Sequence, residues 1–324
     1  MLFINLTSTN PYFNLACEEF LLENFTEDIF MLWQNDNTVV IGRNQNTLSE
    51  INYDYVKEND IRVVRRMSGG GAVYHDKGNV NFTFIKSADG LFADYKTFTK
   101  PIIDFLKTLG ADAVLSGRND ILIDGKKISG NAQFTKCGRI LHHGTLLFSS
   151  SSDVISKVLN VSEEKIKSKG VKSVKSRVTN ISEHINLPID SREFKERLAS
   201  FVVKNYENCQ EYDIQGLADK INELSRKKYE TWEWNFGYSP KYDFLRKKRF
   251  PFGSVEVNLY IEDGIIKNAK IYGDFFSKKN VDEFCAILSG AKHKKEEIEQ
   301  KLLNVNTDDY ISGMNKSDFL ELLF

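Results

Sequence analysis

The residues best suited to chemistry lie in one short stretch, RRMSGGGAVYHD, at residues 65–76. Two arginines stand directly before three consecutive glycines, behind an apolar segment at residues 61–64 that is typical of a strand. Glycines weaken regular structure, but they let a backbone bend sharply and bring its N–H groups close to a phosphate. Arginine adds permanent charge and forked donors for phosphate or carboxylate oxygens. The stretch predicts an anion-binding loop, and a Gly-rich surface turn with solvated arginines is the alternative.

A second candidate stretch, GRNDILIDGKKISGNAQ, spans residues 117–133. Asp124 and Gly125 separate two apolar runs, which is a strong signal for a β-hairpin. Lys126 and Lys127 begin the returning strand, so alternation sends their side chains to opposite faces of the sheet. One lysine is then expected to point into water and the other toward whatever the opposite face holds. Taken alone, this pattern favours ordinary edge-strand lysines.

A third stretch, RILHHGTLLF at residues 139–148, predicts a strand that follows a turn at residues 136–138. The adjacent His142 and His143 must face opposite ways on a strand, and no cysteine or carboxylate cluster completes a metal site around them. The pattern therefore favours a histidine beside a ligand pocket, or one hydrogen-bonded within the sheet, over a metal ligand.

A basic segment, KGVKSVKSRVTNI, covers residues 169–181 and spaces Lys172, Lys175 and Arg177 through small residues. Such a run is usually a solvated face. It could instead fold over an anionic ligand as a lid, because loops commonly carry function.

The elements that must position these residues follow from the hydrophobic patterns. A strand at residues 1–6 leads through Asn10 and Pro11 into a helix, and strands then alternate with glycine turns. A charge run at 245–249, interpreted as solvated linker, ends at Pro251, and a hairpin is expected around Asp263 and Gly264. We predict an α+β fold with a large mixed sheet in residues 1–245 and a small α+β accessory domain in residues 246–324. The expected helices are residues 12–24, 98–109, 151–167, 190–206, 214–227, 281–289, 294–303 and 316–323.

Composition limits the class of protein. The chain has 324 residues, 41% of them hydrophobic, and a net charge of −1, which predicts a globular protein without the basic excess of a nucleic-acid binder. Its four cysteines show no CxxC pairing, which suits a reducing cytoplasm. No apolar run approaches membrane-spanning length, and the N-terminus lacks the basic region of a signal peptide. We therefore expect a cytoplasmic protein that binds neither nucleic acid nor membrane.

Taken together, these stretches resemble the lipoate–protein ligase A family. The resemblance also includes NPYFNLACEE at 10–19, NTVVIGRNQN at 37–46 and WEWNFGYSPKYD at 232–243, in the family's order and spacing. Each motif is moderately specific, whereas their ordered combination is highly specific. The resemblance covers nearly all of the first 245 residues, and the remainder looks like the small accessory domain of the ATP-using members. It implies a catalytic domain of the biotin/lipoate ligase type.

The resemblance implies two reactions at one site. Free lipoate and Mg-ATP give lipoyl-adenylate and pyrophosphate, and a lysine amine of an acceptor domain then takes the lipoyl group and releases AMP. Fixed cations must offset the repulsion between the carboxylate and the phosphates. By the family pattern Lys127 contacts the acyl carbonyl and the α-phosphate. The implied acceptors are the lipoyl domains of 2-oxoacid dehydrogenase complexes and the glycine-cleavage H protein, with no tightly bound cofactor.

Other residues take roles by the same resemblance. Ser68 and His143 join Lys127 at the lipoate, and Asp120 is a possible Mg²⁺ ligand, with the metal held largely by ATP oxygens and water. The residues implied to contact the nucleotide or adenylate are Arg65, Arg66, Gly69, Gly70, Gly71, Ala72, Val73, Tyr74, Asn119, Lys172 and Lys175.

Two other functions remain open on the sequence. An octanoyl or lipoyl transferase would pass the acyl group through an activated cysteine thiolate, and neither Cys137, at a hairpin tip, nor Cys17, in an expected helix, is an evident nucleophile. A non-catalytic protein that binds lipoyl-adenylate is the second, and the intact Lys127 argues against it. The sequence does not distinguish lipoate from octanoate as the better substrate, nor does it identify the preferred acceptor.

Overall fold

A computed structural model describes residues 1–324 apart from 118, 161–176, 207, 239–241 and 276. The chain forms two compact units, one comprising Met1–Arg43 and Glu50–Thr231, the other Asn44–Ser49 and Trp232–Phe324. We call them the large unit and the small unit. The two units divide between Thr231 and Trp232, ahead of the expected boundary at residue 245, which falls inside a strand of the small unit.

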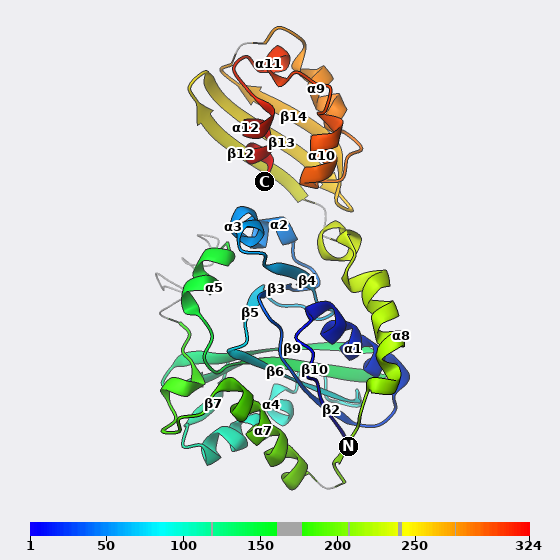
Figure 1. Cartoon of the computed structure of the whole chain (residues 1–324), viewed down its shortest axis with the longest axis vertical. Coiled ribbons are helices and arrows are strands. Elements are labelled where there is room, and N and C mark those ends of the chain that lie inside the picture. Colours follow the sequence, from blue (N-terminus) through cyan, green and yellow to red (C-terminus); the bar gives the residue numbers. More distant parts are fainter. Residues whose placement is uncertain (118, 161–176, 207, 239–241, 276) are drawn as a thin grey trace. The chain divides into compact units, whose positions relative to one another are not determined.

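The large unit is built on a mixed eight-stranded sheet (Figure 1). Its outer strands β11, β1 and β2 are parallel, and the other neighbouring pairs are antiparallel. In spatial order the strands are β11 (Gln210–Glu211), β1 (Leu2–Asn5), β2 (Ile29–Trp33), β6 (Asn79–Ser87), β10 (Arg139–Leu147), β9 (Lys126–Lys136), β8 (Asp120–Ile123) and β7 (Ala113–Ser116).

A second sheet of three strands carries the arginine and glycine stretch. Its central strand β3 (Thr38–Ile41) pairs in parallel with β4 (Arg62–Arg65) and antiparallel with β5 (Val73–His75). The glycines therefore fill the connection from β4 to β5, where the chain changes direction.

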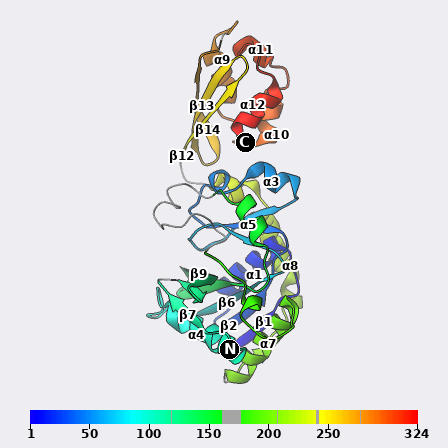
Figure 2. The same ribbon diagram turned by 90° about the vertical axis from the view of Figure 1, so that its left-hand side faces the viewer.

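Helices cover both faces of the large sheet (Figures 1 and 2). Helices α4 (Tyr95–Thr108) and α7 (Ser191–Asn205) pack on one face around a core that includes Phe84, Phe105 and Phe194. Helix α1 (Pro11–Asn24) lies on the other face, together with the three-stranded sheet of β4, β3 and β5. Among the described residues of this unit, the remaining helical segments are α3 (Tyr53–Glu58), α5 (Ser152–Val158), η1 (Ile181–Glu183), η2 (Gln215–Leu217), α8 (Ala218–Leu224) and η3 (Ser225–Tyr229).

Successive side chains of strand β6 point to opposite faces of the large sheet. Val80, Phe82 and Phe84 enter the core under α4 and α7. Asn81 and Thr83 point to the opposite face, where the Thr83 hydroxyl donates to the Glu18 carboxylate of α1 at 2.6 Å. A polar face is thereby buried between the large sheet and α1.

The small unit holds an antiparallel sheet and helices around its own core. The charge run at 245–249 lies within strand β12 and not in a linker, because β12 pairs with β13 along its whole length. The elements are α2 (Thr47–Glu50, whose last residue belongs to the large unit), η4 (Glu233–Gly237), β12 (Tyr242–Phe250), β13 (Gly253–Glu262), β14 (Ile265–Gly273), α9 (Val281–Leu288), α10 (Lys295–Lys301), α11 (Thr307–Tyr310) and α12 (Lys316–Leu323).

The predicted hairpins are confirmed at the level of the turn. Asp124 and Gly125 have φ values of 50° and 74°, and Asp263 and Gly264 have 52° and 71°. Both central residues of each turn are thus left-handed, as a two-residue hairpin with a type I′ turn requires. The helix expected at 151–167 is observed only as α5, which ends at Val158 because Leu159 is extended, and residues 161–167 lie outside the described residues.

Buried His142 makes the stability of the large unit depend on pH. It stacks on Phe98 at 4.6 Å between ring centres, and burial lowers its pKa from 6.5 to about 3. Between these pH values the unfolded chain binds a proton that the folded chain does not, so stability falls as pH drops below 6.5. We expect His142→Phe to reduce the pH slope of the free energy of unfolding by about 1.4 kcal/mol per pH unit.

Urea unfolding followed by tryptophan fluorescence between about pH 5.5 and 4.5 measures this slope for both proteins. Because the slope is compared and not the absolute stability, any packing defect in the variant cancels. Parallel pH profiles for wild type and variant would contradict the assignment.

Candidate active site

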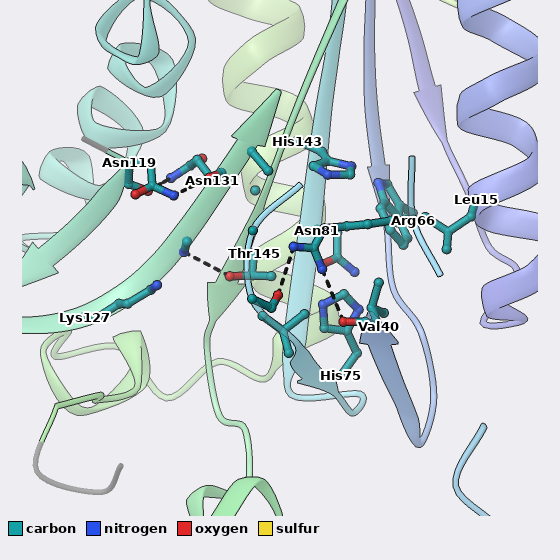
Figure 3. A pocket seen from close by; sticks show the side chains of 17 residues that line it. Leu15, Val40, Arg66, His75, Asn81, Asn119, Lys127, Asn131, His143 and Thr145 are labelled. Carbon is teal, nitrogen blue, oxygen red and sulfur yellow. Dashed lines mark hydrogen bonds between the residues drawn. The ribbon is translucent and has the colours of Figure 1, made fainter. Parts of the chain in front are cut away.

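A pocket in the large unit lies between the polar face of the large sheet, α1 and the glycine loop (Figure 3). Its deep side, which we call the inner wall, consists of residues that are at most 3% exposed: Leu15, Trp33, Val40, His75 and Asn81. The more open side, which we call the rim, consists of Gly70, Gly71, Val73, Asn119, Lys127 and Thr145. Arg66 and His143 also line the pocket.

Arg66 provides a buried positive charge in the pocket wall. Its guanidinium donates to the carbonyls of Val40, Gly69 and Gly71 at 3.2, 2.7 and 2.9 Å. Gly70 has a φ of +94°, and a Cβ there would lie 2.9 Å from Nη2 of Arg66. Burial lowers the pKa of Arg66 only to about 10, so the group is charged at neutral pH. The glycines thus let their loop wrap the arginine with its carbonyl groups.

Lys127 provides a second, more accessible cation on the rim. Its Nζ lies 2.8 Å from the carboxylate of Asp120, and both side chains are 36% exposed. Gly130 leaves space for this amine, because a Cβ on Gly130 would lie 2.8 Å from Nζ. Both backbone hydrogen-bonding groups of Lys127 pair with one neighbouring segment: its N–H donates to the carbonyl of Arg177, and its carbonyl accepts from the N–H of Thr179. The prediction that the two lysines point to opposite faces is confirmed, since Lys126 is exposed and does not line this pocket.

Asn131 ties the turn before β8 to β9. Its side chain donates to the carbonyl of Asn119 at 3.1 Å, and the Asn119 amide donates to the carbonyl of Asn131 at 2.6 Å. This double contact holds Asn119 on the rim beside Lys127. The role of Asn131 was not anticipated from the sequence, because it depends on a register between two strands.

A buried polar chain links α1 to the arginine. Glu18 accepts from Nδ1 of His143 at 3.0 Å, and Nε2 of His143 lies 2.6 Å from the hydroxyl of Ser68. Ser68 in turn accepts from Nε of Arg66 at 3.1 Å. A single neutral tautomer of His143, protonated at Nδ1, satisfies every contact in this chain. Buried Glu18 is therefore connected to buried Arg66 through His143 and Ser68.

Two expected site residues face away from the pocket. The Arg65 guanidinium is fully buried and donates to the carbonyls of Gly42 and Arg43, because successive residues at the end of β4 point to opposite sides. The hydroxyl of Tyr74 donates to Asn37 at 3.0 Å, and burial raises its pKa to about 12. Gly69 and Ala72 belong to the loop around Arg66, and Lys172 and Lys175 lie outside the described residues.

Several pocket residues were missed by sequence reasoning, and part of the signal was present. The run NVNFTF at residues 79–84 alternates polar and apolar side chains within a strand, which indicates a polar buried face and points to Asn81 and Thr83. No local signal marks Trp33, His75 or Glu18, because their approach depends on long-range pairing.

Among the described residues, the pocket has neither a cluster of metal-ligating side chains nor a cysteine in its lining. Within the described part of the chain, no group of three His, Cys, Asp or Glu side chains is arranged to hold a metal ion. All four cysteines are free thiols, with Cys137 exposed and Cys17 buried. None of them lines the pocket. No described helix is both long and apolar enough to cross a membrane.

Comparisons with known proteins agree with this architecture. The family model described as Lipoyl protein ligase A/B catalytic domain matches residues 10–202, and Bacterial lipoate protein ligase C-terminus matches residues 239–323. Lipoate-protein ligase LplJ of Bacillus subtilis is 44% identical, with all of both chains covered.

Solved structures are also similar. A structure of a bipartite lipoate protein ligase and its E2 lipoyl domain from Thermoplasma acidophilum matches with 32% identity and a TM-score of 0.65, covering 74% of this chain and 97% of that one. A lipoate-protein ligase A bound with ATP matches with 29% identity and a TM-score of 0.62, covering 73% and 98%. On these sequence and structural matches, the chain belongs to the lipoate–protein ligase family.

Proposed function

We propose that this ATP-dependent lipoate–protein ligase carries out both of its half-reactions in the pocket lined by Arg66 and Lys127. The observation that carries the proposal is the presence of two cations at one cavity whose inner wall is largely apolar. Such a cavity suits an acyl chain with an anionic head. In the first step a carboxylate oxygen of lipoate attacks the α-phosphorus of ATP, and pyrophosphate leaves. In the second, the acceptor amine attacks the acyl carbon, the bond to AMP breaks, and the amine loses a proton.

Lys127 is proposed as the catalytic residue of both steps. Its amine sits on the rim on a flexible side chain, so it can follow charge from the α-phosphate to the acyl oxygen. Negative charge develops on these oxygens in the two transition states, and a cation placed beside them stabilises it. Arg66 is proposed to contact the adenylate as a rigid, fully charged partner.

The remaining roles follow from position. The loop of Gly69, Gly70, Gly71, Ala72 and Val73 is proposed to wrap the nucleotide together with Asn119, and Ser68 and His143 to hold the acyl chain. Tyr74 and Arg65 would support this loop from behind. The proposed contacts of Lys172 and Lys175 with the adenylate stay predictions.

Mg²⁺ is proposed to arrive with ATP as its substrate complex. Asp120 is the carboxylate that pairs with Lys127 of the rim in the structure. One carboxylate is what a nucleotide-bound Mg²⁺ uses, since phosphate oxygens and waters supply its other ligands.

The acceptors are proposed to be the lipoyl domains of 2-oxoacid dehydrogenase complexes, the glycine-cleavage H protein, or both. The similar ligase from Thermoplasma acidophilum is described with an E2 lipoyl domain. Gly70 and Gly71 are exposed on the rim, so an amine carried on a protein surface can approach there.

Intact-mass measurement of apo acceptor domains tests the proposal. The protein is incubated with each apo domain, lipoate and Mg-ATP, and a parallel reaction omits ATP and supplies a lipoylated donor protein. We expect the lipoyl mass increase only with free lipoate and ATP. Modification only from the donor protein would replace the ligase by a transferase.

A cysteine variant tests the same point from the other side. Cys137 is exposed at the turn between β9 and β10, away from the pocket lining, and burial raises the pKa of the Cys17 thiol, which opposes thiolate formation. We expect Cys137→Ser to ligate lipoate at the wild-type rate in the same mass assay. A strong loss of rate would instead indicate an acyl-enzyme on this cysteine.

A further inference from the structure

Two polar atoms on the inner wall have no hydrogen-bond partner within the described protein. They are Nε2 of His75 and Nδ2 of Asn81, on side chains that are 3% and 1% exposed. Most buried polar atoms in proteins are paired, and each orphan atom calls for an explanation. Because both residues line the pocket, a bound ligand is the direct candidate for the missing partner.

The contacts of each side chain identify both atoms as donors. The Asn35 amide nitrogen lies 3.2 Å from Nδ1 of His75, and the Asn35 oxygen accepts from Asn14 at 3.0 Å. Nδ1 of His75 is thus an acceptor, which leaves the hydrogen on Nε2. The oxygen of Asn81 accepts from Asn79 at 2.9 Å, so the amino group of Asn81 is the group left over.

The charge state of His75 agrees with this assignment. Burial, with Arg66 and His143 nearby, lowers its pKa from 6.5 to about 3. The ring is therefore neutral at physiological pH and offers a single N–H to the pocket.

The positions of the two donors deep in the pocket indicate which part of a substrate they would contact. Lys127 and Asn119 lie on the rim, away from His75 and Leu15 (Figure 3). On the proposed function, the acyl carbonyl is held at Lys127, and the chain runs inward. Its far end then reaches the inner wall, between Leu15, Trp33 and Val40.

We infer that His75 and Asn81 form a subsite for the sulfur atoms of the dithiolane ring and make the enzyme select lipoate over acids that end in hydrocarbon. Disulfide and thioether sulfur are weak acceptors on an otherwise apolar body. That combination fits two donors set among Leu15, Trp33 and Val40 better than a charged group does, since burying an ion there costs much more. An acid that ends in a methyl group would bury both donors and leave them without a hydrogen-bond acceptor.

Competition kinetics of adenylate formation test this inference. The substrates are lipoate, octanoate and cyclopentylpentanoate, in which CH₂ groups replace both sulfurs and the ring shape is kept. We expect wild type to favour lipoate over cyclopentylpentanoate in kcat/KM. Asn81→Leu and His75→Phe remove one donor each at similar size, and each should lower this preference by about threefold to tenfold.

The preference of each variant is the ratio of its kcat/KM values for the two acids, so a reduced fraction of active enzyme cancels. Asn205→Leu, the same replacement at the exposed end of α7, is the matched control and should keep the wild-type preference. The inference is overturned if wild type does not discriminate between lipoate and the carbocycle, or if both variants keep the preference. Failure of the wild type to adenylate any of the acids would refute the proposed function instead.

Discussion

Lys127→Ala is expected to reduce the rate of lipoyl-adenylate formation by about 10²–10³-fold, the loss typical when one group that stabilises a developing oxyanion is removed. The residue stands on the rim of the pocket, and its amine lies 2.8 Å from the carboxylate of Asp120. Release of pyrophosphate from Mg-ATP and lipoate, measured with a coupled assay, gives the rate. A variant that makes lipoyl-adenylate at a near wild-type rate would exclude the catalytic role.

The fold should survive this change. Lys127 is 36% exposed, and its ion pair with Asp120 is open to solvent, so the pair contributes little to stability. Thermal unfolding of the variant should therefore match wild type.

The matched control is the neighbouring lysine. Lys126→Ala removes the same charge from the same strand, but its side chain is exposed and does not line the pocket. We expect adenylate formation at the wild-type rate. Equal losses in both variants would mean that net positive charge matters and not the position of the amine.

The parts of the site that the sequence predicts correctly are local. The Asp-Gly turn places Lys127 at a defined point of the returning strand, because a two-residue turn fixes the register of the hairpin. Strand alternation then separates Lys126 from Lys127 and His142 from His143 without any knowledge of the rest of the fold.

The parts that sequence reasoning misses depend on long-range packing. Arg65 and Arg66 look equivalent in the sequence, and only the place of β4 beside β3 and α1 decides that Arg66 enters the pocket. Glu18 reaches His143 across 125 positions of the chain. The boundary between the units was misplaced because a run of exposed charges resembles a linker. In the structure this run is part of β12, whose Phe244 and Phe250 are buried in the core of the small unit.

Arg66→Ala is the substitution for which we expect the largest loss of stability. The side chain is buried, and it holds the carbonyls of Val40, Gly69 and Gly71 as well as the hydroxyl of Ser68. Removing it leaves these acceptors unpaired and Glu18 buried without a counter-charge at the other end of the His143 chain. Breaking a buried charge arrangement of this kind costs about 3–5 kcal/mol. Urea unfolding of the full chain measures the change.

The loss of binding should accompany the loss of stability and be separable from it. At low urea, where the variant is folded, its affinity for lipoyl-adenylate is expected to fall by about 30-fold or more, since a buried charged contact is lost. Arg62→Ala, at the exposed start of the same strand, is the control and should change the free energy of unfolding by less than about 0.5 kcal/mol. Arg66→Lys tells charge from geometry: an ammonium retains the charge beside Glu18, but it lacks the fork that reaches several carbonyls at once. If Arg66→Lys binds the adenylate as wild type does, the glycine loop needs only a cation; if it behaves like Arg66→Ala, the loop is built around the shape of the guanidinium.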